Sequence, residues 1–227
     1  MTRRSLLSTL LFVVALPAFA FAAGGWAITT VETLPEYLVV GVPTEITFTV
    51  RQHGESPNSA LAPVVEAKSG LTSIIAKATR AARPGEYVAE VSLPRTGDWK
   101  LTIMTSAPKP LSFLPSPSML GRSELLPIRA INAGTPAPAP ASPVDRGKAL
   151  FVAKGCVGCH VHGAVERESF KVGPELTRLG YTADHLSSLL RDPPPPRLGG
   201  MRMPNLGLHP DEISALVAFL SPPAKGR

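Results

Sequence analysis

The sequence predicts two domains, an all-β sandwich followed by an all-α domain. Before residue 106, three segments separated by turn signals alternate apolar and polar side chains strictly, which is typical of half-buried antiparallel strands. After Ser142, apolar side chains recur at spacings of three and four, which is typical of amphipathic helices. A stretch rich in Pro, Ala and Ser separates the two patterns, and 227 residues are enough for two domains.

Residues 1–23 have the features of a secretory signal peptide. Arg3 and Arg4 form a basic start, and an apolar run from Leu6 to Leu16 follows. The segment Ala20-Phe21-Ala22 fits the small-x-small cleavage pattern, so we expect an exported, periplasmic protein. The alternative is an uncleaved segment that anchors the chain to the inner membrane, because 6–23 has about the minimum length for crossing a bilayer.

Residues 24–134 are predicted to form the sandwich. Weaker strands are expected at 26–31, 64–67 and 74–78, and 125–131 is expected at an edge because Pro127 lacks a ladder donor. Six or seven short strands with regular turns indicate an immunoglobulin-like sandwich. Three segments alternate strictly, and their predicted inward residues are Ile46, Phe48, Val50, Tyr87, Ala89, Val91, Leu93, Trp99, Leu101 and Ile103.

Four motifs of this domain point to a known family; they are Leu34-Pro35, Thr47 to Gly54, Gly85-Glu86-Tyr87 and Gly97-Asp98-Trp99. With these motifs the domain resembles the YtkA-like (FixH-related) family of small exported sandwiches. The resemblance implies a fold more than an activity, although some relatives are linked to copper delivery or oxidase assembly. One histidine and two scattered methionines (His53, Met104 and Met119) make no convincing soft-metal cluster.

Residues 135–143 alternate alanine and proline and are predicted to be a linker. Such a sequence favours polyproline II, a semi-rigid spacer that would span about 25 Å when fully extended. An ordinary tether is the alternative.

Residues 144–221 are predicted to be helical, and 222–227 form a tail. A first helix begins at Ser142-Pro143-Val144-Asp145, and two more are expected at 182–191 and 210–220. The expected inward residues are Gly147, Leu150, Phe151 and Lys154 in the first helix, Ala183, Leu186, Leu189 and Leu190 in the second, and Ile213, Leu216, Val217 and Leu220 in the last.

The two cysteines of the chain form the motif Cys156-Val157-Gly158-Cys159-His160. This spacing is the attachment signature of c-type haem, in which two thiols bond the porphyrin and the adjacent imidazole ligates iron. We therefore expect one covalent heme c. A thioredoxin-like redox pair would need a βαβ context, and a zinc site would need more ligands than this sequence offers.

Further markers surround this motif; they are Gly147 with Phe151, Val172 to Leu176, Met203-Pro204, and a last helix containing Phe219. With them, the second half resembles a monohaem class I cytochrome c domain. The resemblance implies that the first and last helices cross where Gly147 lets Phe219 approach. It also implies that Pro174 packs on the histidine side, where a neighbouring carbonyl holds the His160 ring.

The sixth iron ligand is predicted to be Met203, with His160 on the opposite face. A thioether favours ferrous iron, and Met203 precedes a proline as in the family's methionine loop. Met201 in the same loop is the alternative. Among the histidines, His162 is too near His160 to reach the other face, and His185 and His209 are expected at the surface or at a helix cap.

These observations predict a one-electron carrier rather than an enzyme, with the sandwich as a docking module. The net charge of +6 is not concentrated in a basic stripe, so no nucleic acid is expected. No catalytic triad, phosphate loop or paired-acid motif indicates a small-molecule substrate. The expected partners are redox proteins, among them a membrane-bound respiratory complex. The alternatives are a haem subunit of a larger respiratory or dehydrogenase complex, and a metal-delivery or oxidase-assembly factor.

Overall fold

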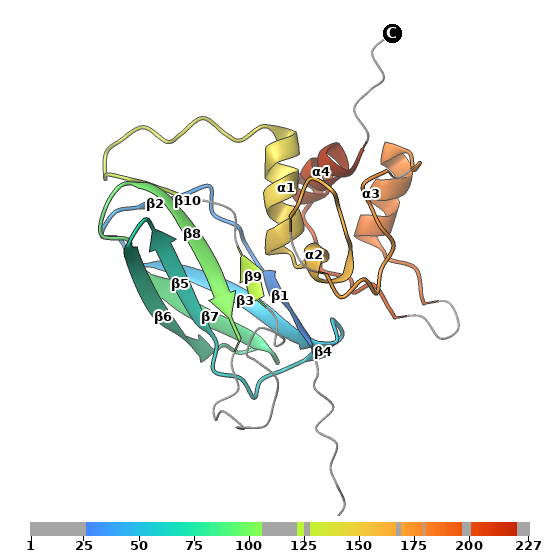
Figure 1. Cartoon of the computed structure of the whole chain (residues 1–227), viewed down its shortest axis with the longest axis horizontal. Helices are drawn as coiled ribbons and strands as arrows, with labels where there is room; N and C mark the ends of the chain where they lie inside the picture. Colours follow the sequence, from blue (N-terminus) through green and yellow to red (C-terminus); the bar gives the residue numbers. More distant parts are fainter. Residues whose placement is uncertain are drawn as a thin grey trace, which may run out of the picture.

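The computed structural model describes residues 26–105, 122–124, 128–166, 169–178, 180–196 and 201–221. The predicted signal segment, the tail, Met119 and Pro127 lie outside these residues. Strands occupy the described chain up to Ile131 and helices follow from Pro143, so both predicted fold classes are confirmed (Figure 1).

The β-domain is built from short strands joined in one hydrogen-bonded path. The path runs β1-β3-β7-β6-β5-β8-β10-β2, with β4 beside β3 and β9 beside β8. The strands are β1 (Ala27–Val31), β2 (Tyr37–Val39), β3 (Thr44–Gln52), β4 (Ser56–Pro57), β5 (Val64–Ser69), β6 (Thr72–Arg80), β7 (Glu86–Val91), β8 (Gly97–Met104), β9 (Arg122–Glu124) and β10 (Ile128–Ile131).

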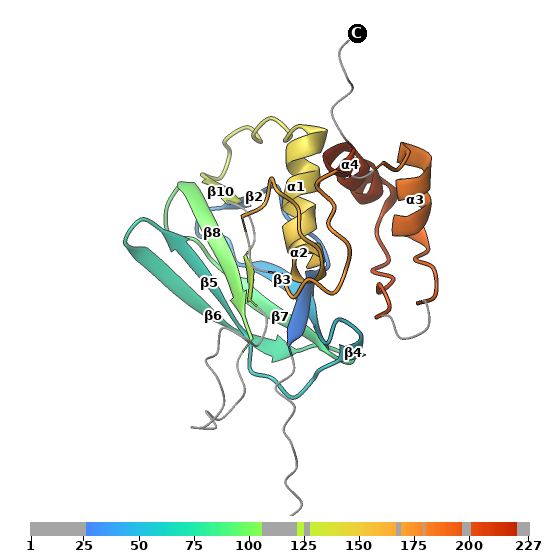
Figure 2. The same cartoon turned by 45° about the vertical axis from the view of Figure 1, so that its right-hand side comes forward.

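The two layers of the domain are the two halves of one curled sheet. Strand β6 joins them, since its residues 72–77 pair with β5 and its residues 78–80 pair with β7. A long strand that changes partner part-way is a usual way to turn the corner of a sandwich. Figure 2 shows β5 and β8 on one side of the domain and β3 and β7 on the other.

The core lies between these layers and consists of the side chains that alternation predicted. All ten predicted inward residues of β3, β7 with Leu93, and β8 are at most 1% exposed, so that prediction is confirmed. Full burial of a large apolar side chain stabilises the fold by about 1.5–3 kcal/mol, and Trp99, Tyr87 and Phe48 are the largest of the set.

The predicted edge position of the last strand is wrong. Strand β10 lies between β8, its antiparallel partner, and β2, its parallel partner. Because β10 begins at Ile128, the proline that suggested an edge lies before the strand. The true neighbour, β2, has three residues, which is too short for alternation to reveal.

Four helices follow, α1 (Pro143–Ala153), α2 (Cys156–Cys159), α3 (Ala183–Arg191) and α4 (Pro210–Leu220). Helix α1 begins as expected, since the Ser142 hydroxyl accepts a hydrogen bond from the Asp145 backbone N–H at 3.1 Å. Helices α1 and α4 cross in direct contact at Gly147, where an added Cβ would lie 2.0 Å from the Ala215 carbonyl oxygen. Beside this crossing the rings of Phe151 and Phe219 lie 5.7 Å apart.

The predicted inward faces of α1 and α4 are confirmed, whereas that of α3 is partly wrong. Leu186 and Leu190 are buried, but Ala183 is exposed because it is the first residue of the helix, at its end. Leu189 is half-buried because it lines the cavity described below.

The two domains are in direct contact, so the linker does not hold them apart. All five residues of β1 are buried, one face by the sandwich core and the other by the helical domain. Ile28 illustrates the second contact, since a Cβ at Gly158 would meet its Cδ1 at 2.0 Å and one at Gly155 would meet its Cγ2 at 2.5 Å. The buried apolar residues of both domains therefore form one cluster, and Figure 1 shows α1 and α2 beside β1.

Candidate functional site

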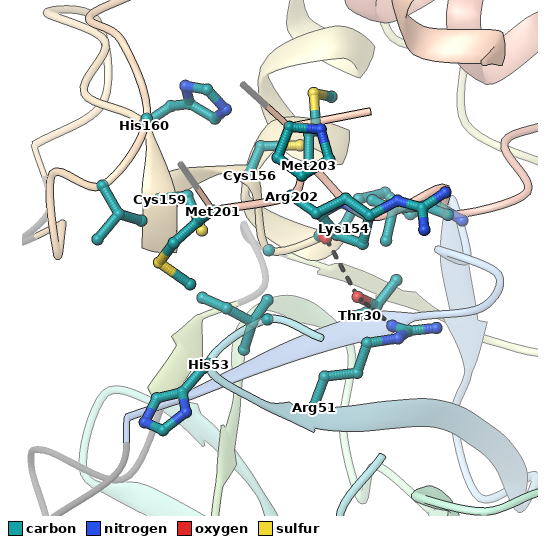
Figure 3. A pocket seen from close by; sticks show the side chains of 18 of the residues that line it. Thr30, Arg51, His53, Lys154, Cys156, Cys159, His160, Met201, Arg202 and Met203 are labelled. Atoms are coloured by element: carbon teal, nitrogen blue, oxygen red, sulfur yellow. Dashed lines mark hydrogen bonds between the residues drawn. The ribbon is translucent and has the colours of Figure 1, made fainter. Parts of the chain in front are cut away.

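A cavity of about 290 Å³ lies where the two domains meet. Its lining includes every residue predicted for the cofactor, namely Cys156, Cys159, His160, Pro174 and Met203, and also the alternative ligand Met201. Figure 3 labels the cysteines, His160 and both methionines. These residues come from α2, from the loop after it and from the loop before α4. The fold thus gathers side chains that are up to 47 positions apart in the chain around one space.

The cysteine motif is positioned by a sharp turn after α1. Gly155 has φ +78° and ψ 10°, a left-handed conformation that favours glycine, and it separates α1 from α2. The single turn of α2 then places Cys156 and Cys159 on the same side, since they are three residues apart. His160 leaves the turn in an extended conformation, which directs the chain away from the helix.

Burial keeps both thiols protonated at neutral pH. It raises the pKa of Cys156 to about 12 and that of Cys159 to about 11, and the neighbouring Cys159 adds to the shift of Cys156. Thioredoxin-like pairs need the opposite, a thiol whose pKa is lowered so that thiolate is available. The site therefore does not have the electrostatics of a dithiol redox centre.

The His160 ring is held in one orientation. Its Nδ1 lies 2.9 Å from the carbonyl oxygen of Pro174, and because a carbonyl only accepts, Nδ1 carries the proton. Gly173 lies against the ring, since an added Cβ would be 2.4 Å from His160 Cε1. Burial also lowers the pKa of His160. The result is a neutral imidazole whose Nε2 keeps a free lone pair, as an iron ligand requires.

The two candidate methionines differ in their surroundings. Met203 is half-buried and packs against the hydrophobic core, whereas Met201 is 42% exposed. Both line the cavity, as Figure 3 shows. The greater burial of Met203 supports the choice made from the sequence, and that choice stays a prediction.

The remaining histidines of the helical domain lie away from the cavity. His162 is buried and packs on Phe219, with ring centroids 4.3 Å apart. His185 is exposed beside Tyr181, and His209 is the exposed N-cap of α4. All three positions agree with the expectation that none of them opposes His160.

Sequence reasoning missed that the β-domain supplies one wall of the cavity. Ile28 and Thr30 of β1, Arg51 of β3 and His53 of the following turn all line it. No local pattern reveals this wall, because the contacts join residues more than 120 positions apart; the Thr30 hydroxyl, for example, donates to the Lys154 carbonyl at 3.3 Å.

His53 lines the cavity edge without pointing into it. Its ring is directed away from the two cysteines and lies edge-on to Trp26, with centroids 5.6 Å apart (Figure 3). Trp26 in turn stacks on Phe170 of the helical domain at 4.6 Å. His53 therefore takes part in an aromatic contact between the domains.

The charged residues that line the cavity are all basic. They are Arg51, Lys154 and Arg202, and no Asp or Glu is among the described lining residues. Lys154 is 3% exposed and already has two partners, since its Nζ lies 2.8 Å from Glu212 Oε1 and donates to the Glu32 carbonyl at 2.7 Å. The two arginines account for the remaining positive charge.

The described residues contain neither a cluster of metal-ligating side chains nor a membrane-spanning helix. No group of three or more His, Cys, Asp or Glu side chains within the described ranges is placed to hold a metal ion. Within the same ranges, no helix has the length and apolar character needed to cross a membrane.

Comparison with known proteins identifies the helical part. Residues 144–222 match the model of the cytochrome c family, so the helical region is a cytochrome c domain. Among solved structures, the "ZirS C-terminal Domain" is similar over 58% of this chain and 87% of its own, with 13% identity and a TM-score of 0.32. At that TM-score the likeness supports no argument about the β-domain. No curated protein matches the chain.

Proposed function

From the cytochrome c domain at residues 144–222, we propose that this chain is an exported one-electron carrier with a single covalent haem. The observation that carries the proposal is the cavity that gathers both thiols, the oriented imidazole and a methionine sulfur. The donor set fits the group, because thiols form thioethers with the porphyrin, and neutral imidazole with thioether is a usual ligand pair for low-spin haem iron.

Each residue of the site has a separate task. Cys156 and Cys159 would hold the porphyrin covalently, His160 would ligate the iron through Nε2, and Met203 would supply the second axial ligand. When bound, haem supplies the one-electron ferric–ferrous couple. If His160 and Met203 both bind the iron, no ligand position would remain for a substrate, which favours electron transfer over catalysis.

The surroundings of the ligands suit this task. The Pro174 carbonyl fixes the tautomer and plane of His160, and Gly173 leaves room for the ring. Pro204 follows Met203 and restricts the backbone of the loop that presents the sulfur. These restraints would limit the movement of His160 and of the methionine loop, which favours rapid electron exchange.

Further parts of the proposal concern location and partners. Export fits the basic and apolar start of the chain and the usual extracytoplasmic place of this family. We propose redox proteins as partners, a membrane-bound respiratory complex among them, and a sandwich of the YtkA-like kind as the docking module. The direct packing of β1 on the helical domain supports a joint role for the two domains.

The ligand assignment is tested by comparing Met203→Ala with Met201→Ala in the full chain. We expect Met203→Ala to abolish the near-infrared charge-transfer band that ferric Met–iron coordination produces, and to lower the midpoint potential, because a thioether favours ferrous iron. Met201→Ala serves as the matched control and should leave the band intact. Survival of the band in Met203→Ala would show that the assignment is wrong.

A further inference from the structure

The hairpin between β3 and β4 meets the methionine loop, which precedes α4 in the helical domain. His53 and Gly54 of the hairpin turn line the cavity, and so do residues 201–203 of the loop. A hydrogen bond joins the two segments, because the Arg202 backbone N–H donates to Glu55 Oε1 at 3.0 Å. A carboxylate of the β-domain therefore holds the backbone of the loop that carries both candidate sulfur ligands.

The turn that carries Glu55 is itself fixed within the β-domain. The His53 backbone N–H donates to the Trp26 carbonyl at 2.8 Å, and the Glu55 backbone N–H donates to the Gln52 carbonyl at 3.1 Å. Gly54 between them is buried and has φ +73°, a left-handed conformation that favours glycine. The exposed side chain of Glu55 thus extends from a well-held backbone toward the loop.

The methionine loop has little other support at this point. Among the described residues, no further hydrogen bond holds residues 201–204. The next bond along the loop comes from Asn205, whose side-chain amide donates to the Arg191 carbonyl at 3.2 Å. The bond to Glu55 is charge-assisted, because a carboxylate accepts it, and such bonds are stronger than neutral ones. Its loss should therefore free this part of the loop.

We propose that Glu55 of the β-domain is a positioning residue, which holds the methionine loop closed so that its sulfur stays on the iron. This inference rests on the proposed function, because it needs haem with a methionine ligand. Arg202 stands between Met201 and Met203, so the bond restrains the loop whichever sulfur binds. The β-domain thereby gains a role in iron ligation, in addition to any docking role.

The test uses imidazole as a competitor for the methionine position in the full-length ferric protein with its covalent haem. Imidazole can bind the iron only after the methionine has left, so its apparent Kd falls as the fraction of open loop rises. The titration follows loss of the near-infrared charge-transfer band. The matched control for Glu55→Ala is Glu45→Ala, which removes the same charge from an exposed position near the start of β3, away from the cavity lining.

We expect Glu55→Ala to lower the apparent Kd for imidazole by roughly two- to tenfold, as the loss of one intramolecular hydrogen bond predicts. Glu45→Ala should keep the Kd of the wild type. Glu55→Gln should lie between the two, because its amide oxygen still accepts a hydrogen bond but carries no charge. If Glu55→Ala does not fold, Glu55→Lys decides, since lysine also lacks an acceptor.

Equal imidazole Kd values in Glu55→Ala and Glu45→Ala would overturn the inference while leaving the proposed function intact. A wild-type chain without covalent haem, or one whose ferric haem lacks the charge-transfer band, would instead overturn the proposed function or its ligand set, and the inference with it.

Discussion

At the scale of single residues, the site depends on a glycine whose role is purely spatial. The His160 ring occupies the volume that a side chain at Gly173 would fill, with Cε1 and Nδ1 at 2.4 and 2.6 Å from an added Cβ. The Gly173 backbone N–H meanwhile donates to the Cys159 carbonyl at 3.0 Å, so the loop cannot simply move away. A methyl group here would push the imidazole off its bond to Pro174.

We therefore predict that Gly173→Ala weakens iron ligation by His160. Overpacking of this kind costs about 1–3 kcal/mol, so the ratio of high-spin to low-spin ferric haem should rise roughly tenfold. Electron paramagnetic resonance or Raman spin-state bands measure that ratio. Gly180→Ala is the control, because an added Cβ there meets nothing within 4 Å. Equal spin-state ratios in the two variants would contradict the steric role of Gly173.

At this scale, the sequence alone can predict residues whose spacing dictates their chemistry, and it cannot predict residues that only domain packing brings to the site. Cys156, Cys159 and His160 lie within one five-residue motif, so the motif itself predicts their joint chemistry. The sequence pattern does not predict that Arg51 lines the cavity, because an arginine in an alternating strand is expected to be a polar residue of the outer face. Its position at the cavity depends on how two domains pack, which no local pattern encodes.

At the scale of elements, the helical domain is organised by the crossing of α1 and α4. A Cβ at Gly147 would lie 2.0 Å from the Ala215 carbonyl oxygen and 2.7 Å from Phe219 Cβ. The backbone of α1 at Gly147 therefore packs directly against α4. This close approach lets Phe151, Phe219 and His162 form one aromatic cluster under the site.

Gly147→Ala is predicted to destabilise the protein by about 2 kcal/mol. Alanine is favoured over glycine in a helix by about 1 kcal/mol, but separating two packed helices costs more. Denaturant unfolding followed by circular dichroism measures the difference from wild type. Gly180→Ala again provides the control and should keep or slightly raise the stability. Unchanged or increased stability of Gly147→Ala would refute the close crossing.

The elements themselves were predictable to the extent that they are long enough to show a period. Strands β3, β7 and β8 and helices α1 and α4 each present several buried side chains at a regular spacing, and their inward faces were correct. Strands β2 and β4 have three and two residues, and α2 has four, so none of them is long enough for its pattern to recur several times. Local patterns also could not predict that β6 passes from one layer of the sandwich to the other, because its alternation continues unchanged through that point.

At the scale of the whole molecule, the two domains pack against each other around the cavity. Lys154 joins them, since it pairs with Glu212 of α4 and donates to the Glu32 carbonyl of the β-domain. Arg146 donates to the Leu34 carbonyl at 2.9 Å, and the Arg202 backbone N–H donates to Glu55 at 3.0 Å. These bonds connect the β-domain to α1 and to the methionine loop.

The sequence indicated a linker that could hold the two domains apart, and the packing of β1 against the helical domain shows that the domains are nevertheless in contact. All five β1 residues are buried, although a half-buried strand should expose alternate residues. The apolar and hydroxyl side chains of Ala27 to Val31 suit a strand covered on both faces. That continuous pattern was the available signal for a second packing surface.

The central claim is that this cavity holds one haem bound covalently to Cys156 and Cys159. Intact-mass measurement of the full-length chain under denaturing conditions tests it most directly, after production in a host that attaches haem outside the cytoplasm. We predict a mass that exceeds the polypeptide by one haem, and loss of covalent haem in the double variant Cys156→Ala/Cys159→Ala. A polypeptide mass without haem, or a haem that separates on denaturation, would contradict the account.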